Sequence, residues 1–126
     1  MRKATESDVE SCNAICKAVH DRNGELRDSV KQGSAKVVLY GDKITGYTSG
    51  LTYFNHSVGL TNDDLKALIS SATDYYGGPG ILIPSRNTQL FRGCLNNGLR
   101  LVQQLTLMTI GLYNQPAGSY MPSILY

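Results

Sequence analysis

Two cysteines and a histidine near the start of the chain have a spacing that could serve chemistry. Cys12, Cys16 and His20 stand at i, i+4 and i+8, so a helix would present them on roughly one face. Cys and His are zinc ligands, but no fourth ligand lies near them in sequence and no paired Cys-x-x-Cys motif occurs. The same positions continue an apolar helix face with Val9 and Val19. We therefore predict that Cys12 and Cys16 pack in the core and that the chain has no metal site.

His56 is a candidate for acid–base chemistry, because histidine is the side chain that ordinarily titrates nearest to neutral pH. It follows the aromatic pair Tyr53 and Phe54 at the end of a predicted strand. A histidine at such a strand end can act as a general base if a substrate cleft opens there. The alternative is an exposed loop histidine with no catalytic role, and both interpretations stay open.

The segment SRNTQLFRGCLNNGLRLVQQ, residues 85–104, has the signals of a short capped helix that runs straight into a strand. Asn87 can cap the helix start, and Gly98 supplies the left-handed stop. An apolar face between these two positions is formed by Leu90, Phe91, Cys94 and Leu95. A unit of this kind can be plain scaffold, or it can carry a catalytic acid.

The elements that would position these residues follow from local signals. Capping boxes at TESD (5–8) and TNDD (61–64) begin two longer helices, and a shorter one is expected at about 25–32. The runs AKVVLY and ITGYTSGLTYF flank the turn GDK and predict a hairpin. Other strands are predicted at 2–4, 81–83, 99–113 and 119–126. This order predicts an α/β (α+β) fold, in which helices cover both faces of a mixed, mostly antiparallel sheet.

Length and composition limit the classes of protein that remain. A chain of 126 residues makes one domain, residues 1–126, and 41% hydrophobic with 17% charged residues is typical of a globular protein. A net charge of +2 with scattered Lys and Arg predicts no nucleic-acid surface. No run approaches the roughly 18 apolar residues of a membrane span, and the first ten residues lack the apolar core of a signal peptide. The odd count of three cysteines fits a reducing compartment, so we expect a cytoplasmic protein.

Three stretches carry a pattern that is specific in combination: RKATESDVESCNAIC at the start, VVLYGDKITGYTSG in the hairpin and NTQLFRGCLNNGLR near the end. Together they resemble the GNAT family of acetyl-CoA-dependent N-acetyltransferases, over essentially the whole chain. The resemblance implies the acyl-CoA N-acyltransferase fold. More narrowly, NDDLKALI and LTLMTIGLYNQPAGSYMPSILY resemble the second, C-terminal half of bacterial tandem proteins with two GNAT-like domains. Such proteins usually keep the recognisable cofactor loop in their first half.

The resemblance implies a loop of pattern Arg/Gln-x-x-Gly-x-Gly/Ala, whose amides hold the pyrophosphate of acetyl-CoA at a helix start. The corresponding segment is NHSVGLTNDDLKAL, residues 55–68, with Gly59, Leu60 and Thr61 at the loop positions. One glycine of the pattern remains, no Arg or Gln begins it, and an acidic pair at 63–64 occupies the first helical turn. Carboxylates there would repel a diphosphate, so we expect acetyl-CoA to bind weakly or not at all.

The resemblance also implies a catalytic acid, a Tyr four residues before the Gly that ends the last helix. Counting back from Gly98 gives Cys94, a thiol that could donate a proton but that also fits a buried small hydrophobe. Asn87 matches an Asn common in the family, besides being the cap. The candidate catalytic residues are therefore His56 and Cys94, and the candidate cofactor contacts are Gly59, Leu60, Thr61 and Asn87.

Two functions follow from these observations. The first is acetyl-CoA-dependent N-acyl transfer with an unorthodox cofactor loop. The second is a non-catalytic interaction or ligand-binding domain that partners a catalytic GNAT domain or its own copy. The missing glycines, the acidic pair and the missing Tyr favour the second. We expect the last strand, with Tyr120, Ile124 and Tyr126 on one side of a sheet edge, to form an interface with another chain, either a second copy or a partner GNAT domain.

Overall fold

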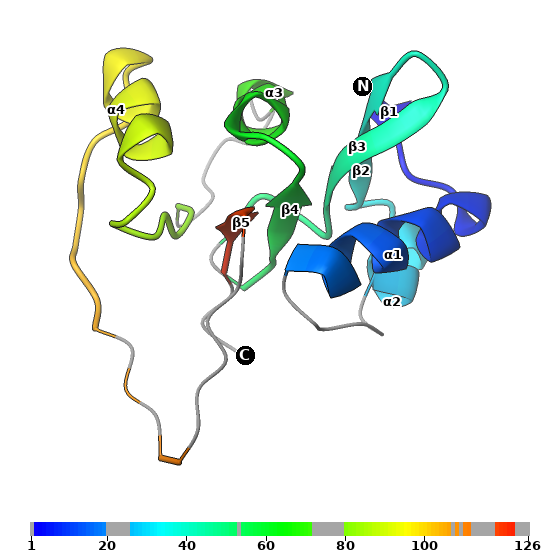
Figure 1. The fold of residues 1–126 in the computed structure, drawn as a ribbon, viewed down its shortest axis with the longest axis horizontal. Helices are drawn as coiled ribbons and strands as arrows, with labels where there is room; N and C mark the ends of the chain where they lie inside the picture. Colours follow the sequence, from blue (N-terminus) through cyan, green and yellow to red (C-terminus); the bar gives the residue numbers. More distant parts are fainter. Residues whose placement is uncertain are drawn as a thin grey trace.

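The fold is an α+β arrangement, known from a computed structural model that describes residues 2–19, 26–52, 54–71, 80–106, 108, 110–111 and 118–122. One five-stranded sheet has the strand order β1-β2-β3-β4-β5, and each neighbouring pair is antiparallel (Figure 1). The strands are β1 (Arg2–Lys3), β2 (Lys36–Tyr40), β3 (Lys43–Thr48), β4 (Ser57–Gly59) and β5 (Ser119–Met121). The predicted sheet is confirmed as antiparallel, but within the described residues it is not mixed.

Helices cover both faces of this sheet, as predicted (Figure 1). The helices on one face are η1 (Glu6–Asp8), α1 (Val9–Val19) and α2 (Leu26–Gln32). On the other face lies α3 (Asn62–Ser70), and α4 (Thr88–Asn96) packs against α3. Within the described ranges, no helix has the length and apolar character needed to cross a bilayer.

The core is divided by the sheet into two clusters, because successive strand residues point to opposite faces. Val37 belongs to the α1-side core, which comprises Ala4, Cys12, Cys16, Ala35, Val37, Tyr47 and Val58. Its neighbour Val38 packs on the α3-side core, which comprises Leu51, Leu65, Leu68, Leu90, Cys94 and Met121. Cys12 and Cys16 are thus core residues, as their place on an apolar helix face predicts, and His20 lies outside the described residues.

The predicted helix boundaries are confirmed where local chemistry sets them. The Thr5 amide donates to the Asp8 carboxylate at 2.8 Å, and the Thr61 amide donates to the Asp64 carboxylate at 3.0 Å, so both capping boxes form. The Asn87 side chain accepts from the Leu90 amide at 3.3 Å and begins α4. After the last turn of α4, Gly98 has a φ of 91°, which a side chain would strain.

Several strand predictions are wrong. β3 ends at Thr48 rather than at residue 54, because the Thr48 hydroxyl accepts the Gly50 amide at 3.1 Å and turns the chain. The predicted strand at 81–83 does not form; Ile81 and Ile83 pack on the α3-side core without pairing. The position beside β4 is taken by β5, so no partner is left there for these three residues.

The predicted strand at 99–113 is also wrong over its described part. Residues 99–106, 108 and 110–111 belong to no strand, and their side chains are exposed. This yellow-to-orange stretch runs away from the sheet and helices (Figure 1). A strand is stable only beside a partner, and none of the described strands lies along it.

Of the three residues predicted to form the interface side of the last strand, only Tyr120 lies in the described part of the chain, and it is buried. Tyr120 is 7% exposed, pairs with Val58 across β4 and β5, and lies under the Arg86 guanidinium at 5.4 Å. It is therefore part of the packed domain rather than of an exposed contact surface. Ile124 and Tyr126 lie outside the described residues.

A pH dependence of stability follows from Asp8, which is buried and held by Arg2 through two hydrogen bonds of 2.6 and 2.9 Å. The Arg2 hydrogen bond holds the pKa of the Asp8 carboxyl well below its usual range. The pKa of Asp8 is lower in the folded chain than in the unfolded chain, so the ionised carboxylate stabilises the fold. This stabilisation is complete above the unfolded pKa of about 4 and is lost as the pH falls below that value. Urea titrations between about pH 3 and pH 7 should show the wild type losing stability more steeply on acidification than Asp8→Asn. Parallel curves for the two proteins would contradict this assignment.

Candidate functional site

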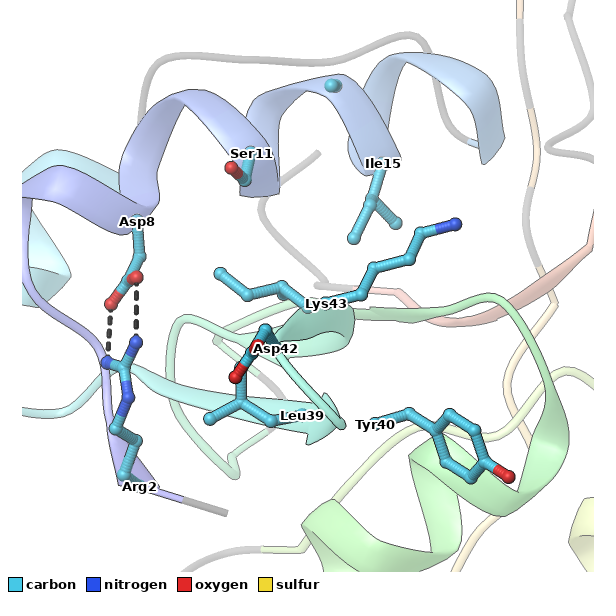
Figure 2. A pocket seen from close by; sticks show the side chains of 10 residues that line it. Arg2, Asp8, Ser11, Ile15, Leu39, Tyr40, Asp42 and Lys43 are labelled. Carbon is cyan, nitrogen blue, oxygen red and sulfur yellow. Dashed lines mark hydrogen bonds and ion pairs between the residues drawn. The ribbon is translucent and has the colours of Figure 1, made fainter.

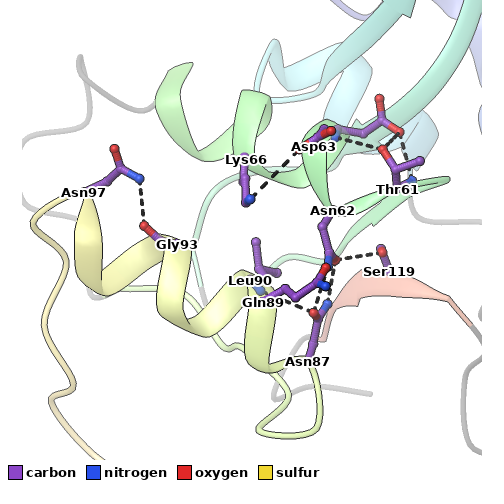
Figure 3. A network of polar contacts seen from close by, with 11 residues as sticks. Thr61, Asn62, Asp63, Lys66, Asn87, Gln89, Leu90, Gly93, Asn97 and Ser119 are labelled. Atoms are coloured by element: carbon purple, nitrogen blue, oxygen red, sulfur yellow. Dashed lines mark hydrogen bonds and ion pairs between the residues drawn. The ribbon is translucent and has the colours of Figure 1, made fainter.

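The starts of α3 and α4 meet beside β5 at one polar junction (Figure 3). Asn62, the first residue of α3, donates from Nδ2 to Asn87 Oδ1 at 3.0 Å, and Asn87 Nδ2 donates back to Asn62 Oδ1 at 2.8 Å. The Ser119 hydroxyl of β5 donates to the same Asn62 oxygen at 2.9 Å. We call Asn62, Asn87 and Ser119 the amide junction. Of its three members, only Asn87 is among the cofactor contacts that the resemblance implies.

Asn87 therefore does more than cap a helix. Its Oδ1 accepts a hydrogen bond from the Leu90 amide, and this bond caps the start of α4. The same oxygen accepts a hydrogen bond from the Asn62 side chain, and this bond holds α4 against α3. The sequence identifies the cap through its place before an apolar run. Asn62 was missed, because an Asn at the first helical position has no local signal and acquires its partner only when α3 and α4 pack together.

The loop before α3 is closed by Asp64. Its Oδ2 accepts from the Thr61 amide and the Thr61 hydroxyl, each at 3.0 Å, and its Oδ1 accepts from the Thr45 hydroxyl at 2.6 Å. The Asp64 amide donates to the Thr61 hydroxyl oxygen at 3.4 Å, and the Leu60 amide donates to the Thr45 carbonyl at 2.9 Å. Three amides of this loop are thus bound within the chain. Thr45 was not foreseen as a contributor, since it lies on β3.

Gly59 is required by close packing. A Cβ on Gly59 would lie 2.9 Å from the Thr61 carbonyl oxygen and 3.0 Å from Asp64 Cβ. Its partner across the sheet, Gly46, would bring a Cβ to the same 3.0 Å from Asp64 Cβ. The two glycines allow the first turn of α3 to lie directly on β3 and β4. The space above Gly59 is filled by α3 and the loop before it.

The charge at the start of α3 is negative. Asp63 and Asp64 stand in the first turn, where carboxylates complement the helix dipole. The Asp63 side chain is 92% exposed, and its ion pair with Lys66 has a separation of 3.9 Å. An exposed ion pair of this length contributes little to the stability of the fold. An anionic ligand approaching this helix start would meet Asp63 first.

Cys94 lies in the α3-side core, 8% exposed, with Leu90 and Met121 in the same cluster. Burial raises the pKa of the Cys94 thiol, and the nearby charge of Lys66 opposes this rise. The thiol therefore stays protonated at neutral pH. Its surroundings are those of a packing residue, because the buried side chains of its cluster are apolar.

His56 is buried rather than presented to a cleft. It is 8% exposed, and its Nε2 lies 3.0 Å from the Tyr47 hydroxyl, with the two rings edge to face at 5.5 Å. Tyr47 belongs to the α1-side core, whereas Cys94 belongs to the α3-side core. The fold therefore does not bring the two candidate catalytic residues together, and neither takes part in the amide junction.

A separate groove of about 760 Å³ lies between α1 and the β2–β3 hairpin (Figure 2). Its walls mix apolar side chains, among them Ile15 and Leu39, with both signs of charge from Asp42 and Lys43. The Arg2–Asp8 ion pair closes one end. None of the residues singled out in the sequence as catalytic or cofactor-binding lines this groove.

Comparison with known proteins gives one finding on the fold. Neither a family model nor a curated protein sequence matches the chain. The structure is similar to the crystal structure of a point mutant of TTHA1254 from Thermus thermophilus, with a TM-score of 0.61 and 16% sequence identity. The similarity covers 90% of this chain and 98% of that chain. At this identity it concerns the fold alone, so the α+β architecture is shared along nearly the whole length of both proteins.

Proposed function

We propose that this chain is a GNAT-like domain that works by binding a protein partner rather than by transferring acetyl groups. The observation that carries this proposal is the state of the loop before α3. Asp64 binds the Thr61 amide and the Thr45 hydroxyl, and it packs against Gly59. A loop held in this way serves to join β4 to α3.

Acetyl-CoA would need more free amides than this loop offers. Its diphosphate is bound best by several free amides at a helix start, with the positive end of the helix dipole behind them. Here the amides of Leu60, Thr61 and Asp64 already donate within the chain. The exposed carboxylate of Asp63 adds negative charge at the same place. We therefore infer that the residues do not fit the cofactor.

The candidate catalytic side chains support the same proposal. Cys94 is enclosed by apolar neighbours, and His56 bonds Tyr47 on the opposite side of the sheet. A general acid and a general base that act on one substrate must both lie within hydrogen-bond reach of it. A second candidate, weak N-acyl transfer, is favoured by one feature, the adjacent starts of α3 and α4 at the amide junction.

Titration calorimetry with acetyl-CoA tests the proposal. We expect no binding in the micromolar range, where the free energy of binding would be about −8 kcal/mol. Asp63→Asn is the informative variant, because it removes the exposed charge and leaves the Thr61–Asp64 capping box intact. It should improve affinity only modestly, since no further amide becomes available.

Asp64→Asn is the matched comparison. Asp64→Asn likewise removes one negative charge from the start of α3, but it weakens the capping box. It should therefore lower the free energy of unfolding by about 1 kcal/mol without creating a binding site for acetyl-CoA. Micromolar binding by the unmodified chain, with acetyl transfer to an amine acceptor, would overturn the proposal and establish the second candidate.

A further inference from the structure

The end of α4 carries an Asn–Gly pair that has the chemistry to react with itself. Asn97 and Gly98 are adjacent, and both are exposed where the helix ends. Asparagine is a thermolabile residue, and glycine has no side chain to shield its amide nitrogen. Every other asparagine in the described part of the chain is followed by a residue with a side chain. Within that part, Asn97 is therefore the asparagine best placed to become an acidic residue.

The reaction uses these two residues and water. The Gly98 amide nitrogen bonds to Asn97 Cγ, the Cγ–Nδ2 bond breaks, and ammonia leaves with the proton that the Gly98 nitrogen gives up. The product is a five-membered succinimide ring. Water then opens the ring at one of its two carbonyl groups and yields aspartate or isoaspartate. In the isoaspartate product the main chain runs through Cβ and Cγ, so it is longer by a methylene.

The folded end of α4 holds Asn97 in a geometry that prevents this reaction. Its ψ of 17° places the Gly98 nitrogen almost over the amide nitrogen of Asn97, whereas ring closure needs it on the side of Cβ. The Asn97 side chain donates from Nδ2 to the Gly93 carbonyl at 2.7 Å (Figure 3). The Gly98 amide donates to the Leu95 carbonyl at 3.3 Å. Reaction therefore requires both bonds to open and Asn97 to rotate about ψ.

This opening disrupts little of the structure. Asn97, Gly98 and Leu99 are all exposed, and the bond from Asn97 to Gly93 lies at the surface. Residues 99–106 after the turn belong to no helix or strand. Chain segments with few buried contacts and exposed hydrogen bonds open at a low cost in free energy. The turn is therefore closed most of the time and open often enough to react slowly.

The product would make the opened turn more stable relative to the closed one. A carboxylate at position 97 has no proton to donate to the Gly93 carbonyl. Its negative charge lies at the C-terminal end of α4, where the helix dipole disfavours it. The Leu99 amide donates to the Cys94 carbonyl at 3.1 Å and ties the next segment to this turn. Conversion of Asn97 thus loosens the connection between α4 and residues 99–106.

We propose that Asn97–Gly98 is a self-modification site. Opening of the last turn of α4 controls the conversion of Asn97 to aspartate or isoaspartate, and the product loosens the segment that follows α4. The reaction needs neither a cofactor nor a partner, so it does not depend on whether the chain binds acetyl-CoA or another protein.

Peptide mapping by mass spectrometry during incubation of the full chain tests the proposal. The same chain in guanidinium chloride gives the rate without the fold. We expect residue 97 to convert roughly tenfold more slowly in the folded chain, because a terminal turn is open for part of the time. Mapping separates this site from Asn23–Gly24, which lies outside the described residues. Equal rates would show that the turn exerts no control, and no conversion in the folded chain would show that the turn stays closed. Either result would overturn the proposal.

Asn97→Asp and Asn97→Gln separate the reaction from its consequence. Asn97→Asp is one of the two products, and its Leu99 amide should exchange with solvent roughly threefold faster than in the wild type. Incubated wild type should approach this faster exchange. Asn97→Gln keeps a side-chain amide but would have to close a larger ring, so incubation should leave its mass and its exchange unchanged.

Asn96→Asp is the matched control for charge. It adds the same charge at the neighbouring exposed position and keeps the bond from Asn97 to Gly93, so the Leu99 amide should respond less. Equal effects of the two Asp variants, or wild-type exchange in Asn97→Asp, would contradict the loosening that we assign to the product.

Discussion

Replacing Gly59 with Ala is expected to lower the free energy of unfolding by about 1–3 kcal/mol, although only one methyl group is added. That methyl would lie 2.9 Å from the Thr61 carbonyl oxygen and 3.0 Å from Asp64 Cβ, so α3 must move away from the sheet. Urea denaturation measures the loss directly. If Gly59 served the approach of a ligand instead, the Ala variant would keep its stability, and that result would contradict the packing role.

Gly93→Ala is the control, and it should change stability in the opposite direction. Gly93 lies inside α4, where Ala is favoured over Gly by about 0.5–1 kcal/mol. A Cβ there would meet the end of the Lys66 side chain at 3.0 Å, and this flexible side chain can move aside. The same substitution should thus stabilise the chain at residue 93 and destabilise it at residue 59.

Replacing Asn87 with Ala is expected to cost about 2–3 kcal/mol, because one side chain performs two tasks. The Leu90 amide loses its cap, and Asn62 loses both bonds of its reciprocal pair. The single variants Asn87→Ala and Asn62→Ala, together with the double variant, form a thermodynamic cycle. We expect a coupling energy of about 1 kcal/mol or more.

Asn97→Ala provides the comparison at the other end of α4. The Asn97 side chain donates to the Gly93 carbonyl at 2.7 Å, but this bond is exposed. Its loss should change stability by no more than about 0.5 kcal/mol. Additive effects of Asn62→Ala and Asn87→Ala would show that the amide junction does not hold α3 and α4 together.

The sequence alone determined the features that depend on neighbouring residues. The capping boxes at Thr5 and Thr61, the cap at Asn87 and the stop at Gly98 each rest on a bond or backbone angle within a few residues. The apolar face of α1 likewise placed Cys12 and Cys16 in the core. The helices, the hairpin and the antiparallel sheet between two helical layers could therefore be predicted.

Pairing between distant segments was decided by the tertiary structure. The runs at 81–83 and 99–113 have strand composition, yet β5 takes the place beside β4, and the described part of 99–113 stays outside the sheet. Strand composition shows that a segment can pair but leaves its partner undetermined, because strand preference depends on packing against neighbours that are distant in sequence.

The candidate site shows the same difference between features set by neighbouring residues and contacts between distant residues. The sequence marked Asn87, Gly59 and the acidic pair at 63–64, but their partners Asn62 and Thr45 lie 25 and 19 residues from the groups that they bind. Local signals could not show whether Cys94 and His56 meet, since Cys94 lies in the α3-side core and His56 bonds Tyr47 of the α1-side core. Contacts of this range exist only after α3 packs on the sheet and α4 packs on α3, so the tertiary structure alone determines what the loop and the two helix starts can bind.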